Sequence, residues 1–173
     1  GLINLEELDC SFYNRYIYNT TGGVYYGNVN SVNLNGLPNL KIFKAFNQPI
    51  TNDINFSVTP NLENIDITNS CGYMNTVNVS NLMNLHTLKA DRVNNNSNHG
   101  NIDLENIIAQ NCTSLINLKM KGNYHLKNIN LQNSSSLQSL ILNDYSLTEV
   151  NNLNPIGCSG LKELVVSSTQ INQ

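Results

Sequence analysis

The sequence predicts a right-handed repeat solenoid of about seven coils, each 22 to 24 residues long, in a single domain. Three observations predict this class: a recurring apolar segment, a second apolar column ahead of it, and a column of turn-forming residues between the two. A single coil cannot bury its apolar face alone, so stacked coils are expected to share one continuous core.

The recurring segment is Leu, two residues, an apolar residue, one residue and another apolar residue. Its alternation predicts a short strand in every coil, and successive strands are expected to form a parallel sheet on the concave face. At about 4.8 Å between strands, seven coils span roughly 30 Å. Copies begin at Leu5, Leu40, Leu62, Leu85, Leu115, Leu137 and Leu161, with separations of 35, 22, 23, 30, 22 and 24 residues, so insertions are expected at about 12–28 and 93–101.

The second column predicts the opposite, convex side of each coil. Eight and six residues before a recurring segment, an apolar pair flanks an asparagine, as in residues 77–79 (VNV) and 129–131 (INL). This period of two predicts an extended segment with the apolar pair inward and the asparagine outward. Little helix is expected, and the stretch 103–115 is the exception, because four apolar residues between Leu104 and Cys112 follow helical spacing.

Asparagine makes up 35 of the 173 residues, and much of it has a structural role in this interpretation. Asn4, Asn39, Asn61 and Asn84 stand directly before a recurring segment, and Ser or Gly takes this place in the other coils. These residue types tolerate left-handed or side-chain-capped turns, so the column predicts a corner that leads into each strand. The amides are also expected to satisfy backbone groups between coils.

On these residues the chain resembles bacterial leucine-rich repeats of the internalin-like and surface-antigen kind. The resemblance covers about residues 2–171, and NCTSLINLKM and GCSGLKELVV are especially similar to such repeats. It implies an α/β-type leucine-rich-repeat solenoid of bacterial type. This sequence departs from the family pattern at the asparagine that usually follows the LxxLxL segment. Only Asn123 stands at the expected place, whereas Asn47 and Asn69 lie one position earlier. The runner-up architecture is a three-faced parallel β-helix, which needs three strand lines where the sequence shows two apolar columns.

Charge and composition argue against several function classes. Nine basic and twelve acidic residues give a net charge of −3, which provides no basic field for nucleic acid. No run reaches the roughly 18 apolar residues of a membrane span, so no membrane insertion is expected. No motif for catalysis, a cofactor or a metal occurs. The cysteines occupy core positions, and Cys112 and Cys158 lie two coils apart, so free thiols are expected.

The leading hypothesis is a non-enzymatic recognition or scaffold module that binds a protein or glycan through the concave face, the usual binding surface of a solenoid. The resemblance implies an extracellular or cell-surface location on a bacterium, with a phage virion as the alternative. Two further classes stay open: a structural tile in a larger assembly, and a polysaccharide-acting β-helix enzyme. The enzyme would need two carboxylates across a groove, and the nearest carboxylates in the sequence are Glu6, Glu7 and Asp9.

Two features are candidate partner sites, and a partner is expected to dock between them. The insertion after the first strand holds six of the twelve aromatic residues, whose rings either cover the open first coil or offer contact area with a polar tip. The second feature is a group of mixed charges on the concave side. The candidate residues are Tyr13, Tyr16, Tyr18, Tyr25 and Tyr26 in the insertion, and Lys44, Asp66, Lys89, Asp91, Arg92, Lys119 and Lys121 on the sheet.

The chain begins and ends inside a repeat, without a polar capping element. Solenoids need their terminal coils covered. Residues 1–173 are therefore expected to be one domain from a longer protein, or a chain whose ends contact a neighbouring domain or subunit.

Overall fold

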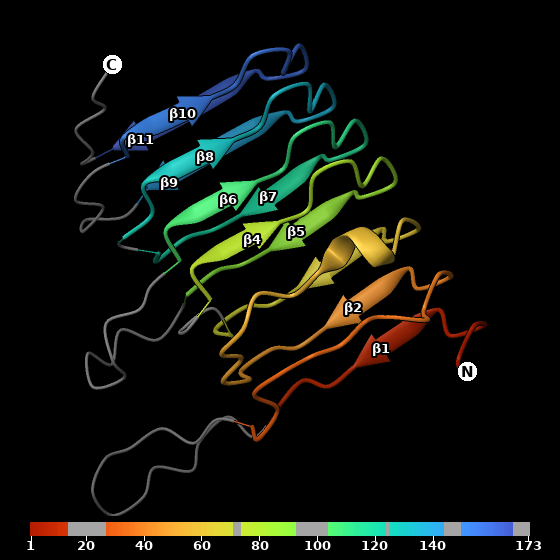
Figure 1. Cartoon of the computed structure of the whole chain (residues 1–173). Coiled ribbons are helices and arrows are strands. Elements are labelled where there is room, and N and C mark those ends of the chain that lie inside the picture. Colours follow the sequence, from red (N-terminus) through yellow and green to blue (C-terminus); the bar gives the residue numbers. More distant parts are fainter. Residues whose placement is uncertain (14–26, 71–73, 93–103, 124, 144–149, 168–173) are drawn as a thin grey trace, which may run out of the picture.

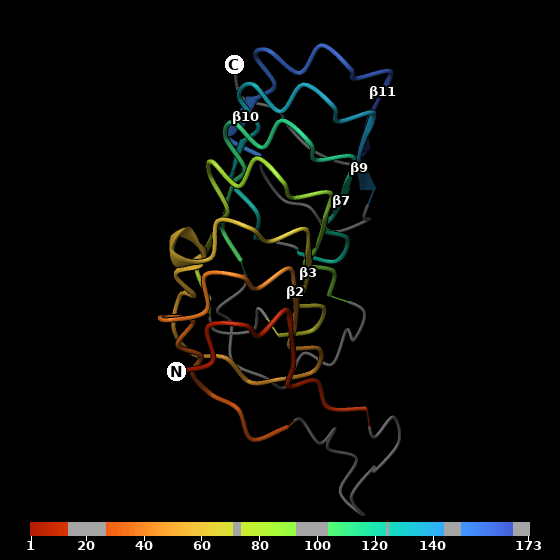
Figure 2. The same cartoon turned by 90° about the vertical axis from the view of Figure 1, so that its right-hand side faces the viewer.

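The computed structural model describes residues 1–13, 27–70, 74–92, 104–123, 125–143 and 150–167. The chain winds into stacked coils, with the first and the last coil at opposite ends of the stack (Figure 1). Two parallel sheets run along the stack, and Figure 2 shows them on opposite sides of the molecule. The repeat solenoid predicted from the sequence is confirmed.

The larger sheet has seven strands, one from each recurring segment, in the order β1-β2-β3-β5-β7-β9-β11. The middle apolar residue of each segment lies in one register column, in which Phe43 pairs with Ile65 and Ile65 with Leu88. The strands are β1 (Glu7–Asp9), β2 (Ile42–Lys44), β3 (Asn64–Asp66), β5 (Thr87–Lys89), β7 (Asn117–Lys119), β9 (Ser139–Asn143) and β11 (Glu163–Ser167).

The second apolar column forms the smaller sheet, in the order β10-β8-β6-β4. Val77 and Ile129 are buried in it, as the period of two predicts. In the second coil the same column forms the short 3-10 helix η1 (Phe56–Val58), which begins at the N-cap Asn55, so the sheet ends at β4. The strands are β4 (Thr76–Asn78), β6 (Asn106–Ile108), β8 (Asn128–Asn130) and β10 (Asn152–Asn154).

The helix expected over residues 103–115 is wrong. Residues 106–108 form β6, in which Ile107 is the register partner of Val77 and Ile129. The N–H groups of Glu105 and Asn106 both donate to the carbonyl of Asn75 in the preceding coil. A helix bonds its backbone internally, whereas this stack needs bonds between coils, and that requirement overrides the helical spacing of the apolar residues.

The left-handed corners also differ in position from the prediction. They lie four residues before a recurring segment or seven residues after its start, and none lies directly before one. The residues directly before the segments act through their side chains instead: Asn39 Nδ2 donates to the Ile3 carbonyl, and Asn61 Nδ2 donates to the Pro38 carbonyl. Residues with positive φ are Gly36, Asn47, Asn69, Asn81, Asn111, Gly122, Asn133 and Gly157.

The two sheets share one apolar core, which is sealed at the corner after the larger sheet by buried polar side chains. Asn123 Nδ2 donates to the Ala90 carbonyl at 2.8 Å, and at the same place in earlier coils Ser70 donates to the Ala45 carbonyl. A buried carbonyl without a partner would cost about 1 to 3 kcal/mol, so these bonds are part of the fold. Asparagine bonding between coils, which the sequence predicts, is thereby confirmed.

A second inter-coil column contains thiols and a hydroxyl. Cys112 Sγ donates to the Val79 carbonyl at 3.0 Å and Cys158 Sγ to the Leu131 carbonyl at 3.1 Å, with Ser134 in the coil between them. Cys10, Cys112 and Cys158 are free thiols, as predicted, and Cys71 lies outside the described residues.

Candidate functional site

A row of charged side chains crosses the outer surface of the larger sheet. By register it contains Asp9, Lys44, Asp66, Lys89 and Lys119, one from each of the first five strands. Opposite charges alternate over the first four positions, an arrangement in which neighbouring coils attract each other. The alternation ends at Lys119, which lies next to a second lysine.

The lysines before this break have carboxylate partners. Lys44 Nζ lies 2.6 Å from Glu7 Oε1, and Lys89 Nζ lies 3.4 Å from Asp66 Oδ2. Among the described residues, Lys119 has no ion pair. Its ammonium group is therefore available to an acidic ligand.

The larger sheet opens next to Lys119. β9 pairs with β11 over five residues, but it pairs with β7 only through Asn117 and Ser139. In the preceding coil, the residue after the strand, Ala90, donates its N–H to the carbonyl of Lys119. The equivalent N–H of Met120 has no hydrogen-bond partner in the described part of the chain. The opening therefore contains a backbone donor that the sheet does not use.

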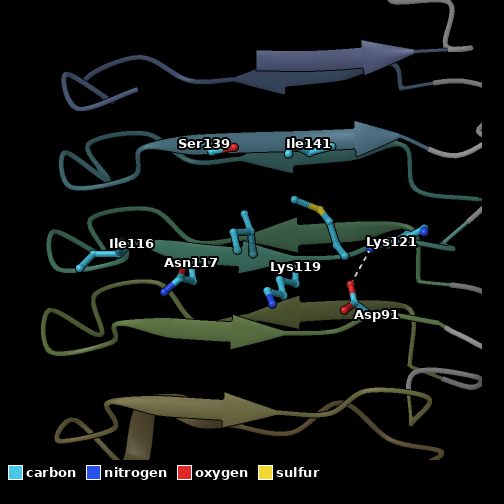
Figure 3. Close-up of a pocket in the computed structure, with 9 residues that line it drawn as sticks. Asp91, Ile116, Asn117, Lys119, Lys121, Ser139 and Ile141 are labelled. Atoms are coloured by element: carbon cyan, nitrogen blue, oxygen red, sulfur yellow. Dashed lines mark hydrogen bonds between the residues drawn. The ribbon is translucent and has the colours of Figure 1, made fainter. Parts of the chain in front are cut away.

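A groove of about 350 Å³ occupies this opening, and we call it the β7–β9 groove (Figure 3). Its volume falls within the range of small-ligand sites, about 300 to 1,000 Å³. Ile116 and Ile141 expose 39% and 47% of their surface, whereas Leu118 and Met120 are buried. The groove thus combines apolar surface with the ammonium group of Lys119, which has no ion pair among the residues that the structure describes. It is lined by Asp91, Ile116, Asn117, Leu118, Lys119, Met120, Lys121, Ser139 and Ile141.

One end of the groove is held by a rigid corner. Asp91 Oδ1 accepts a hydrogen bond from the backbone N–H of Lys121 at 2.8 Å, as the dashed line in Figure 3 shows. The N–H of Arg92 donates to the Lys121 carbonyl at 2.6 Å. Gly122 follows with φ +79°, and a Cβ at this position would lie 1.9 Å from the Arg92 carbonyl oxygen. These contacts fix the backbone from which Lys121 extends.

The structure brings together some of the predicted site residues. Asp91, Lys119 and Lys121 line the groove. Tyr13 lies on the first coil, where its ring stacks on Phe46 with 6.3 Å between centroids, and four strand spacings, roughly 19 Å, separate that coil from Lys119. Lys44, Asp66 and Lys89 lie on the same sheet outside the groove, and Arg92 follows β5 at the corner that holds one end of the groove. Tyr16, Tyr18, Tyr25 and Tyr26 lie outside the described residues.

Sequence reasoning placed Ile116, Ser139 and Ile141 in no site. The sequence contains only a weak signal for these residues. Ile141 is an apolar residue at an outward strand position, and Ile116 is an apolar residue directly before the polar Asn117. Single exposed apolar residues are normal in proteins, so only their shared position in the lining of one groove identifies them.

The outer surface of the smaller sheet carries asparagine ladders. Asn128 Nδ2 donates to Asn106 Oδ1 at 2.6 Å, and Asn152 Nδ2 donates to Asn128 Oδ1 at 2.7 Å. A trough of about 300 Å³ lies among these amides. Because the amides bond one another, this surface offers a ligand fewer unpaired groups than the β7–β9 groove.

The carboxylates that an enzyme would need are engaged by other groups. Glu6 Oε2 lies 3.0 Å from Lys41 Nζ, and Glu7 is paired with Lys44. Burial would raise the pKa of Asp9, but hydrogen bonds from Ser11 and Tyr13 outweigh it and hold that pKa below its ordinary value. A general acid needs a raised pKa, so this geometry does not support glycoside hydrolysis.

Other chemistry has little support in the described residues. Burial raises the pKa of the Cys112 thiol to about 11, which removes the thiolate that a nucleophile requires. The described residues contain no group of three or more His, Cys, Asp or Glu side chains placed to hold a metal ion. They also contain no helix that is long and apolar enough to cross a membrane.

Two parallel sheets, recurring LxxLxL strands and a core shared between coils define the class: the chain has a leucine-rich-repeat solenoid fold of the bacterial type. Among solved structures it is similar to the functional domain of InlJ from Listeria monocytogenes, which includes a cysteine ladder. The TM-score is 0.67 at 19% sequence identity, over 99% of this chain and 36% of that one, so the likeness shows the fold alone. No protein-family model matches the chain, and no curated protein matches it by sequence.

Proposed function

We propose that the chain is a non-enzymatic recognition module that binds another macromolecule in the β7–β9 groove. Three features coincide at one break in the sheet, and they carry this proposal: exposed isoleucines and, counted over the described residues, a lysine without an ion pair and a backbone N–H without a hydrogen bond. Equivalent groups are paired elsewhere in the sheet, and a local break of this kind in the regular pairing is typical of functional surfaces.

The fold class supports the same proposal, because solenoids commonly present a sheet surface to their partners. The paired carboxylates and the buried thiols favour binding over catalysis. An extracellular or bacterial cell-surface location is part of the proposal, and its support is the likeness to InlJ together with the resemblance of the repeats to internalin-like sequences.

Binding to an immobilised panel of synthetic peptides and purified bacterial polysaccharides tests the proposal. The groove variants are Lys119→Glu and Ile141→Asp. The matched control is Lys162→Glu, which makes the same charge change on an exposed lysine that does not line the groove. Circular dichroism checks that each variant is folded.

We expect at least one panel member to bind the wild type and the control, and to lose binding to both groove variants. If the wild type binds no panel member, or if every ligand that it binds also binds both groove variants equally well, the proposal is wrong.

A further inference from the structure

We infer that the ligand of the β7–β9 groove is an extended acidic peptide, with a carboxylate side chain that pairs with Lys119 and an aliphatic side chain two residues away that packs between Ile116 and Ile141. This inference rests on the proposed function and names the chemistry of its partner.

Charge selects a carboxylate. Lys119 has no ion pair in the described part of the chain, and its register neighbour in the preceding coil is Lys89. Lys121 lines the same groove, and the nearby carboxylate of Asp91 is held by a backbone N–H. In a chain whose net charge is −3, this is a local excess of positive charge. An acidic ligand is therefore attracted to this place more than to the rest of the sheet.

The lining favours a peptide over a glycan. Sugars stack on aromatic rings, which offer a broad apolar face with a polar tip. None of the nine lining residues is aromatic, and the exposed apolar surface comes from Ile116 and Ile141. An aliphatic peptide side chain can make close dispersion contacts with these branched side chains.

The open strand edge favours an extended backbone. Within the residues that the structure describes, the N–H of Met120 has no hydrogen-bond partner, and the strands on either side of the opening share one register pair. A peptide carbonyl that accepts from this N–H would make a bond of the kind that strand addition uses. Residues two apart on a strand face the same side at about 6.6 Å, the spacing of Asn117 and Lys119 on β7. An acidic and an aliphatic residue two positions apart in the peptide would therefore both face the groove, and each could contact its own part of the lining.

The probe is a fluorescein-labelled, C-terminally amidated peptide with the sequence Gly-Glu-Ser-Ile-Gly, titrated by fluorescence anisotropy. Two matched peptides replace its Glu by Gln or its Ile by Ala. The protein variants are Lys119→Gln, Ile141→Ser and the control Lys162→Gln.

We expect the Gln peptide to bind the wild type and the Lys162→Gln control about tenfold more weakly than the Glu peptide, because a charge-assisted hydrogen bond is lost. In Lys119→Gln the two peptides should bind equally. Ile141→Ser should weaken the Ile peptide and leave the Ala peptide unchanged. The Met120 amide resonance should shift on titration of the wild type.

The inference is wrong if the wild type binds none of the peptides, if the Glu and Gln peptides bind it equally, or if their difference survives in Lys119→Gln. The two proposals fail separately. A polysaccharide that binds the wild type but binds neither Lys119→Glu nor Ile141→Asp would overturn the peptide inference and support the recognition site.

Discussion

The outer surfaces of the two sheets use polar side chains in opposite ways. On the smaller sheet, Asn106, Asn128 and Asn152 form a ladder in which the middle amide both donates and accepts. On the larger sheet, charges pair between coils until Lys119, where the pairing and the sheet hydrogen bonds break at the same place.

The difference separates two roles of polar residues in a solenoid. A ladder whose members satisfy one another ties the coils together and leaves few groups for a ligand. A recognition surface needs groups that the fold leaves unpaired, and it gives up some stability at that place. The same contrast predicts how substitutions in each surface, and in the core that both sheets share, change the stability of the chain.

Truncation of the core should destabilise the chain equally from either sheet. Leu88 and Ile107 are both fully buried, one in each sheet. Leu88→Ala and Ile107→Ala should each lower the free energy of unfolding by about 2 to 5 kcal/mol, because they remove packing and leave a cavity. Urea titration followed by circular dichroism measures this loss. A transition that splits into two steps in either variant would show that the sheets do not share one cooperative core.

The corners should differ in their tolerance of a side chain. Gly122 and Gly36 both have φ +79°, but a Cβ at Gly122 would meet the Arg92 carbonyl, whereas a Cβ at Gly36 would meet nothing within 4 Å. Gly122→Ala should therefore cost about 2 to 4 kcal/mol from strain and overpacking. Gly36→Ala should cost only the backbone strain, about 1 to 2 kcal/mol. Equal denaturation midpoints for the two variants would contradict this account of the corner beside the groove.

An asparagine in a ladder should matter more than one beside the groove. Asn128→Ala removes two side-chain hydrogen bonds of the smaller sheet, so it should cost about 1 to 2 kcal/mol. Asn117 is exposed and its side chain has no hydrogen bond in the described part of the chain, so Asn117→Ala should change stability by less than about 0.5 kcal/mol. Thermal denaturation of both variants checks the difference. A larger loss for Asn117 than for Asn128 would reverse the contrast between the two surfaces.

The smallest effect should come from a half-buried ion pair whose two residues stand directly before β6 and β8 of the smaller sheet. The Lys127 ammonium, 2.6 Å from Glu105, holds the pKa of that carboxyl below its ordinary value of 4.5. A lowered pKa means that the pair stabilises the fold above about pH 4.5 and loses this contribution as the pH falls through the folded-state pKa. Urea midpoints of the wild type and Glu105→Gln should therefore differ slightly at pH 7 and converge in acid. A difference that grows below pH 4.5 would show that the sign is wrong.

The column of recurring leucines was sufficient to predict the strands of the larger sheet. Each segment repeats the same apolar alternation, so a shift by one residue would turn Phe43 or Leu88 out of the core, and only one register buries all of them. The free thiols of Cys112 and Cys158 followed from the same register, because positions two coils apart are too distant for a disulfide.

Three features depended on contacts that local sequence does not contain. The segment with helical spacing became β6 because backbone groups of Glu105 and Asn106 bond to another coil. The left-handed corners lie at other positions than predicted, because their position depends on where each coil must turn to contact the neighbouring coil. The β7–β9 groove exists because β9 pairs with β11 over five residues and with β7 at only one. Which neighbour β9 pairs with depends on the assembled sheet and not on local sequence. The repeat determined which residues face the core, whereas tertiary hydrogen bonding determined where the coils separate.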